Sequence, residues 1–173
     1  FVGEGPGLPA LRRLVEELKI AAHVDFLGTL TPAQLAPVYA GALVFVGMGT
    51  AACEAAMYGA PVVIALVYEP QCLTPGFFGQ PGLEGFGEVV PGQAKDSAAD
   101  LLRLLLADPA ERSRIAARGQ AKALADHHPD AAYARMSALL ASPAKPPVSH
   151  PWPFPKWRHL LANYLSGRAF SRP

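Results

Sequence analysis

The segment from Val46 to Val63, which reads VGMGTAACEAAMYGAPVV, restricts the fold more than any other part of this chain. An apolar strand pattern over 42–46 ends in a glycine-containing turn, and a helix pattern follows over 51–58. A second apolar strand is predicted over 61–66, after a glycine and a proline. Two short strands joined through a helix favour a parallel pair.

Strand and helix patterns alternate along most of the chain. This alternation predicts an α/β fold, a Rossmann-like parallel sheet with helices on both faces. Thr31 and Gln34 form a capping-box pattern at the start of one helix, and Asp108 and Glu111 form a second. The predicted strands are 23–27, 42–46, 61–66 and 88–90, and the helices are 8–18, 32–39, 51–58, 97–107, 109–125 and 130–140, with Asp96 as a cap and a long loop over 69–87.

The composition excludes several classes of protein. With 51% hydrophobic and 17% charged residues, the chain can form a folded core. A net charge of +1 gives no basis for a nucleic-acid partner. The longest apolar run, residues 60–68, is too short to span a bilayer. Two cysteines, Cys53 and Cys72, form no disulfide framework, which favours a cytoplasmic location. Abundant Ala, Pro, Leu and Arg favour a bacterial source.

The proline content predicts two parts, a domain over 1–142 and a tail over 143–173. Six of the eighteen prolines lie between Pro143 and Pro155, which indicates an extended linker. An amphipathic aromatic segment follows it. Its aromatic residues fit a peripheral contact with the inner face of the membrane, a partner, or a hydrophobic patch of this protein; they are Trp152, Phe154 and Trp157. The opening Phe1-Val2-Gly3 reads as the end of a strand and predicts that the chain is a piece of a longer polypeptide.

The turn between the strand at 42–46 and the next helix has the composition of a phosphate site. Gly47 and Gly49 allow a ligand to approach the backbone, and Thr50 offers a hydroxyl at the helix start. Glu54 is the one charged residue between Ala40 and Val67. In apolar surroundings its carboxylate needs hydrogen-bond donors, which ribose hydroxyls would supply, whereas on the surface it needs none.

Three other patterns have simpler interpretations. Residues 5–10 match G-x-G-x-x-A, but two prolines and the lack of a suitably spaced acid favour an ordinary helix-entry turn over dinucleotide binding. His127 and His128 are compatible with a metal site, and a helix end is the preferred interpretation. Cys53 is predicted to fill space in the core.

The stretch Glu54-Ala55-Ala56-Met57-Tyr58-Gly59-Ala60-Pro61 resembles the donor-binding signature of GT-B glycosyltransferases, especially family 4. The Gly3-Glu4-Gly5-Pro6 turn and the segment from Val24 to Gly28 resemble further parts of that domain. The resemblance covers roughly residues 1–140. It implies the donor half of a hexosyltransferase, with Glu54 on the ribose of a UDP- or GDP-sugar and no metal. The donor site would comprise Gly3, Gly5, Gly47, Met48, Gly49, Thr50 and Glu54, with the loop residues Gln71, Thr74 and Gln80 near the sugar.

The sequence departs from this family in two ways. Family 4 carries a second glutamate eight positions before Glu54, where this chain has Val46. The Gly-Met-Gly-Thr loop instead resembles the peptidoglycan N-acetylglucosaminyl transferase, which inverts configuration, so retention and inversion both stay open. The family's basic residues and its N-terminal acceptor-binding domain lie upstream of the part seen here, so the chain alone is expected to be inactive. Two alternatives are a nucleotide-sugar 2-epimerase and a non-catalytic binding module.

Overall fold

The computed structural model describes residues 1–83 and 85–142. The chain divides into two compact units, Phe1–Met136 and Ser137–Pro173. The predicted tail over 143–173, with its aromatic cluster, lies outside the described residues, and the boundary at 142 stays a prediction. None of the described helices combines the length and the apolar character that crossing a membrane requires.

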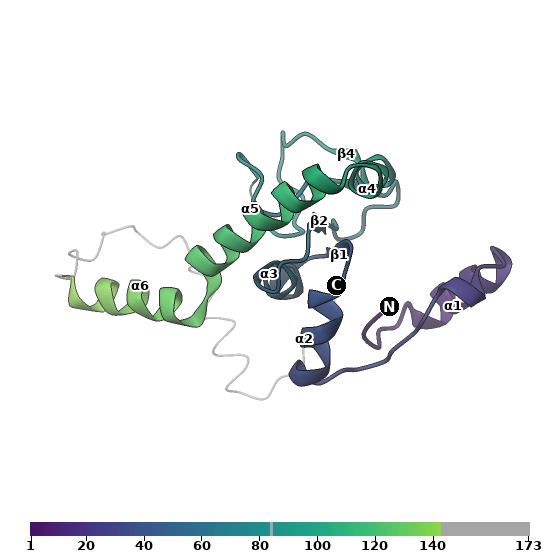
Figure 1. Cartoon of the computed structure of the whole chain (residues 1–173), viewed down its shortest axis with the longest axis horizontal. Helices are drawn as coiled ribbons and strands as arrows, with labels where there is room; N and C mark the ends of the chain where they lie inside the picture. The colour runs from purple at the N-terminus through teal and green to yellow at the C-terminus, as the bar shows by residue number, and fades with distance from the viewer. Residues whose placement is uncertain (84, 143–173) are drawn as a thin grey trace, which may run out of the picture. The chain divides into compact units, whose positions relative to one another are not determined.

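The described residues form helices and short strands, connected by loops (Figure 1). All six predicted helices are confirmed, and their ends agree with the prediction to within two residues. The capping box at Thr31 is also confirmed, since the Gln34 side chain accepts the Thr31 N–H at 2.9 Å. The elements are α1 Leu8–Glu17, a 3₁₀ turn η1 Ala21–His23, α2 Pro32–Ala40, β1 Phe45–Gly47, α3 Gly49–Met57, β2 Val62–Ile64, β3 Leu73–Thr74, β4 Asp96–Ser97, α4 Ala98–Ala107, α5 Pro109–His127 and α6 Pro129–Ala141.

The central sheet is built on a parallel pair, β1 and β2, with Phe45 opposite Val62. The segment after β3 adds to the other edge of β2 in the antiparallel sense, because Ile64 N–H donates to Gly76 O and Phe78 N–H donates to Val62 O, both at 3.0 Å. β3 and β4 form a separate antiparallel pair. The prediction of a parallel sheet is therefore confirmed for two strands only.

Both faces of β2 are covered, which is the layering expected of an α/β protein. Val62 and Ile64 pack in one apolar cluster with the alanines of α3. Val63 points to the opposite face, where Leu105 of α4 and Ile115 of α5 pack against it. Figure 1 shows α3 and α4 on opposite sides of the β1–β2 pair. The prediction of helices on both faces holds for this part of the sheet.

In the first 28 residues, the backbones of the segments before α1 and after η1 are hydrogen-bonded to each other, although neither segment is an assigned strand. Phe1 N–H donates to Asp25 O at 2.6 Å, Leu27 N–H to Phe1 O at 2.8 Å, and Gly3 N–H to Gly28 O at 2.7 Å. These bonds advance in the same direction along both segments, as in a parallel pair. The predicted strand at 23–27 is wrong: residues 21–23 form the 3₁₀ turn η1, and residues 24–27 form no assigned strand.

The predicted loop over 69–87 contains structure that the sequence did not indicate. Thr74 is fully buried and Phe78 is 1% exposed, so this segment contributes to the core. Its glycines and prolines concealed that role. The glycines and prolines set its turns. The loop glycines at 76, 79, 82, 85 and 87, and Gly92 just after the loop, adopt positive φ.

Two predicted local features are wrong. Residues 88–90 form no strand; the Glu88 carboxylate instead accepts the Phe86 N–H at 2.7 Å, which makes a turn. Asp96 does not cap α4, because it lies in β4. The cap is Ser97, whose hydroxyl oxygen accepts the Asp100 N–H at 3.3 Å.

Candidate functional site

The turn from β1 into α3 is the strongest candidate for a ligand site. Met48 alone separates the end of β1 from the first residue of α3, and it makes no side-chain cap. The first N–H groups of a helix have no partners within the helix, so this end is open to an acceptor. It also lies at the carboxyl end of a parallel strand, where ligands of α/β proteins bind.

Gly49 gives this turn its shape. Its φ is +60°, a conformation that favours glycine, and a Cβ at this position would meet nothing within 4 Å. The Gly49 N–H donates to the Phe86 carbonyl at 2.6 Å. The prediction that this N–H holds a diphosphate is therefore wrong for this structure. The next residue, Thr50, is exposed and presents its N–H and hydroxyl at the helix start.

Gly47 and Met48 serve the packing of the turn. A Cβ on Gly47 would lie 2.5 Å from the Phe45 ring, and the Gly47 carbonyl accepts the Ala65 N–H at 2.8 Å. Met48 is 39% exposed, and its Cβ would lie 2.5 Å from a Cβ added to Gly87. The segment around Gly87 thus lies directly against the turn.

Glu54 lies one helical turn after Thr50 and is exposed. Of the two alternatives for its surroundings, exposure on the surface is the one observed, because the alanines beside it on α3 face the core while Glu54 faces outward. Its Oε2 accepts the Tyr39 hydroxyl at 3.4 Å. Burial, followed by the negative charge of Glu54, raises the pKa of the Tyr39 phenol, so Tyr39 remains a donor. The carboxylate keeps further lone pairs for a ligand.

Gly3 and Gly5 lie in the N-terminal segment, before α1. Gly3 has φ +111° and donates to Gly28, and Gly5 O accepts the Leu8 N–H at 3.0 Å. The hydrogen bonds of both glycines stay within the first 28 residues. The structure gives no contact between them and the β1–α3 turn, so their place in the site stays a prediction.

The three loop residues expected near a sugar differ in their burial and in their hydrogen bonds. Thr74 is fully buried, and its hydroxyl donates to Ile64 O at 2.6 Å, so the proposed sugar contact is wrong for this residue. The Gln80 side chain accepts the Phe77 N–H at 3.2 Å. Gln71 is exposed, and its N–H donates to Glu69. Gln71 is the one of the three whose side chain stays free of these contacts within the described loop.

Two residues of this region escaped sequence analysis. Along the sequence, a strand and two turns lie between Tyr39 and Glu54, and Phe86 lies still further along the chain. Neither carries a local signal, because each approaches the turn only through the fold. The closest that the sequence comes to such a signal is the presence of a tyrosine in the helix before the glycine turn.

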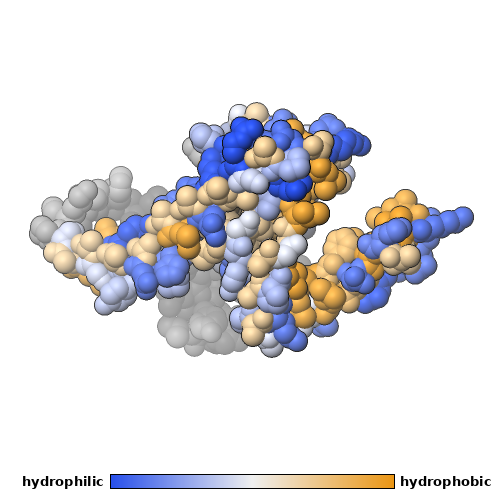
Figure 2. Space-filling view, in the orientation of Figure 1, coloured by the Kyte–Doolittle hydropathy of each residue, from blue (hydrophilic) through white to orange (hydrophobic). Residues whose placement is uncertain are grey.

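Two cavities are formed by residues between Val46 and Leu102, and neither is lined by Thr50 or Glu54. The larger one, about 420 Å³, lies at the carboxyl ends of β1 and β2 against α4, with Glu69 and Cys72 as its polar residues among mainly apolar ones. A hydrogen bond from Lys95 lowers the pKa of Glu69. Figure 2 shows apolar side chains reaching the surface in several places, and Leu43 and Val46 are among those exposed.

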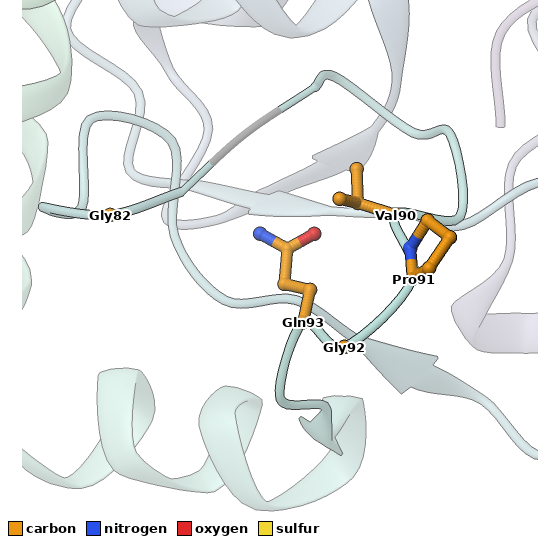
Figure 3. Close-up of a pocket in the computed structure, with 5 residues that line it drawn as sticks. All are labelled: Gly82, Val90, Pro91, Gly92 and Gln93. Atoms are coloured by element: carbon orange, nitrogen blue, oxygen red, sulfur yellow. The ribbon is translucent and has the colours of Figure 1, made fainter.

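A second cavity of about 230 Å³ is formed by the loop before β4. Figure 3 shows the Gln93 amide pointing into it, and glycines and Pro91 form much of its wall. Within the described residues there is no group of three side chains suited to hold a metal. His127 is the last residue of α5, and its ring packs against Phe86, which supports the helix-end interpretation of the histidine pair.

The fold and the turn together define an α/β protein with an uncapped helix end at the carboxyl end of a parallel strand pair. A family model described as "Glycosyl transferase-like" matches residues 6–140. The chain belongs to this family of glycosyltransferase-like domains. No curated protein and no solved structure matches the chain.

Proposed function

We propose that this chain binds the nucleotide-diphosphate part of an activated sugar at the β1–α3 turn, as the donor half of a GT-B glycosyltransferase of the hexosyltransferase type. One observation carries the proposal: the α3 N-terminus has no side-chain cap, and Thr50 and Glu54 are exposed on it one turn apart. Family membership supports the transfer of a sugar as the reaction class.

Each group has a role in the proposal. The Thr50 N–H and hydroxyl, with the positive end of the α3 dipole, hold the diphosphate. Gly47, Met48 and Gly49 shape the turn, and Gly49 leaves open space beside it. Glu54 accepts hydrogen bonds from the ribose, and Tyr39 holds the carboxylate in place.

The proposed chemistry is positioning and stabilisation of a departing diphosphate by protein donors, without a metal. UDP and GDP are the expected nucleotides. Gly3, Gly5 and Gln71 would contribute to the opposite wall and the sugar region. The acceptor would bind an N-terminal acceptor-binding domain of the same polypeptide, located in the cytoplasm or at the inner face of the membrane.

Calorimetric titration of UDP, GDP and ADP into the chain tests the proposal. Glu54→Ala should weaken binding of the preferred nucleotide by about 1–3 kcal/mol, because a hydrogen bond to a charged group is lost. Glu17→Ala is the matched control, since Glu17 is an exposed carboxylate at the end of α1. Tyr39→Phe should have a smaller effect in the same direction, because the carboxylate is retained.

Four outcomes would count against the proposal. Absence of binding by the unaltered chain at millimolar nucleotide contradicts donor binding. Equal losses for Glu54→Ala and Glu17→Ala contradict the site. Binding of nucleotide with no sugar transfer when the acceptor domain is supplied would favour the non-catalytic binding module, and release of free sugar isomer without an acceptor would favour the 2-epimerase.

A further inference from the structure

His127 lies at the end of α5, far along the chain from the β1–α3 turn, yet it contacts a residue that touches the turn. Its ring meets the Phe86 ring edge-on, with centroids 5.1 Å apart and an interplanar angle of 86°. The Phe78 ring completes the cluster, 5.6 Å from Phe86 and 6.2 Å from His127. Phe78 is 1% exposed and belongs to the core, so the cluster has a fixed base.

The backbone of Phe86 and Gly87 is hydrogen-bonded on both sides. The Phe86 carbonyl accepts the Gly49 N–H at 2.6 Å, and the Gly87 carbonyl accepts the Val67 N–H at 3.0 Å. These two residues therefore connect the start of α3 to the segment that follows β2.

Gly87 explains why this connection is so close. Its φ is +134°, and an added Cβ would lie 2.5 Å from the Met48 Cβ and 3.0 Å from the Ala65 carbonyl oxygen. No side chain fits there without moving the backbone. The position of Phe86 and Gly87 thus determines the position of the turn itself.

We propose that His127 is a positioning residue for the donor site: its ring fixes Phe86, whose carbonyl fixes Gly49 and the orientation of the α3 N-terminus. The inference rests on the proposed function for its ligand, and on geometry alone for the connection from His127 to Gly49. It gives the histidine a role that needs no metal and no proton transfer.

Two measurements on the whole chain test the inference, both at one pH. The first is hydrogen exchange of the Gly49 amide without nucleotide, referred to the amide of Ile64, which is bonded in the sheet. The second is calorimetric titration of UDP and GDP. His127→Ala should speed Gly49 exchange relative to Ile64 and weaken nucleotide binding, each by about three- to tenfold, the range that an aromatic pair supports.

Matched variants separate positioning from a general loss of stability. His127→Phe keeps a ring edge against Phe86 and should restore both values, whereas His127→Leu fills the space without a ring face and should not. If His127→Ala fails to fold, the Phe and Leu variants carry the comparison. His128→Ala is the control, because His128 faces Asp130 at 3.6 Å and makes no contact with the ring cluster.

The outcomes are decisive in either direction. Unchanged Gly49 exchange in His127→Ala, or an equal rise at Gly49 and Ile64, overturns the inference. Tighter nucleotide binding in His127→Ala also overturns it, because the Phe86 carbonyl would then compete with the ligand. If the unaltered chain binds no nucleotide, the proposed function fails, while the exchange comparison still decides the connection from His127 to Gly49.

Discussion

The hydroxyl of Thr74 is a structural group that links β3 to the backbone of β2. It donates to Ile64 O at 2.6 Å, and its oxygen accepts the Gly76 N–H at 3.1 Å. The side chain is fully buried, so both partners depend on it for a hydrogen bond. A buried polar group that loses its partner is costly because water cannot replace it.

Thr74→Val should therefore lower the free energy of unfolding by about 1–3 kcal/mol, since valine keeps the shape and removes the hydroxyl. Urea unfolding measures the change. Affinity for the nucleotide sugar, measured by titration under folding conditions, should be unchanged. A loss of affinity without a loss of stability would restore the sugar-binding role that the structure argues against.

Tyr39 couples the core to Glu54. It is 5% exposed, stacks with Tyr58, and contacts Phe45 edge-on. Burial, and then the charge of Glu54, raise the pKa of its phenol above the ordinary value of about 10. The folded state therefore binds the phenolic proton more tightly than the unfolded state does.

This difference predicts alkaline destabilisation. Because the folded-state pKa is raised, the contribution is fully present below pH of about 10 and is lost as the pH rises through the folded-state pKa. Urea unfolding at pH values from about 8 upward should show a decline in stability that is shallower in Tyr39→Phe. Tyr133→Phe, at an exposed tyrosine, is the comparison and should leave the decline unchanged.

At the scale of elements, the close approach of α3 and α5 holds the site against the core. Gly119 of α5 lies where an added Cβ would be 3.3 Å from the Phe78 carbonyl oxygen and 3.9 Å from the Ala56 Cβ. Gln120 of α5 also donates to the Met57 carbonyl at 3.0 Å, which satisfies the C-terminal end of α3. Small residues on both helices allow this close approach.

Gly119→Leu should lower the free energy of unfolding by about 1–3 kcal/mol, because the larger side chain overpacks the interface. Ala117→Leu, on the exposed side of the same helix, is the matched control and should change stability little. Thermal or urea unfolding distinguishes the two. Equal effects would show that α5 does not pack on α3 through Gly119 in solution.

At the scale of the whole molecule, the proposal is that the site binds the diphosphate through protein donors alone. Nucleotide titration in the presence of a chelator should give the same affinity as titration without it, because Thr50 and the helix end interact with the diphosphate directly. A chelator-dependent loss of affinity that added Mg²⁺ or Mn²⁺ restores would show that a metal bridges the diphosphate. Affinity should fall at high salt, since the interaction is with a charged ligand.

The sequence was sufficient for the elements whose signals are local. Thr31, Pro32 and Gln34 mark the start of α2 because capping depends on residues within one helical turn. Val62, Val63 and Ile64 mark a strand buried on both faces because an apolar run cannot be stable in water. The position of the glycine turn before α3 was predicted to within two residues, because its signal is also local.

The tertiary structure decided what depends on contacts between distant residues. The exposure of Glu54, the burial of Thr74 and the engagement of the Gly49 N–H by Phe86 all arise from which face of each element meets the core. Residues 1–28 likewise pair in a manner set by hydrogen bonds across more than twenty residues. The sequence by itself determined the α/β alternation and the glycine turn, and the proposed type of ligand also comes from the sequence. Only the fold decided which of those groups stay free for that ligand, because a hydrogen bond made within the protein is no longer available to a ligand outside it.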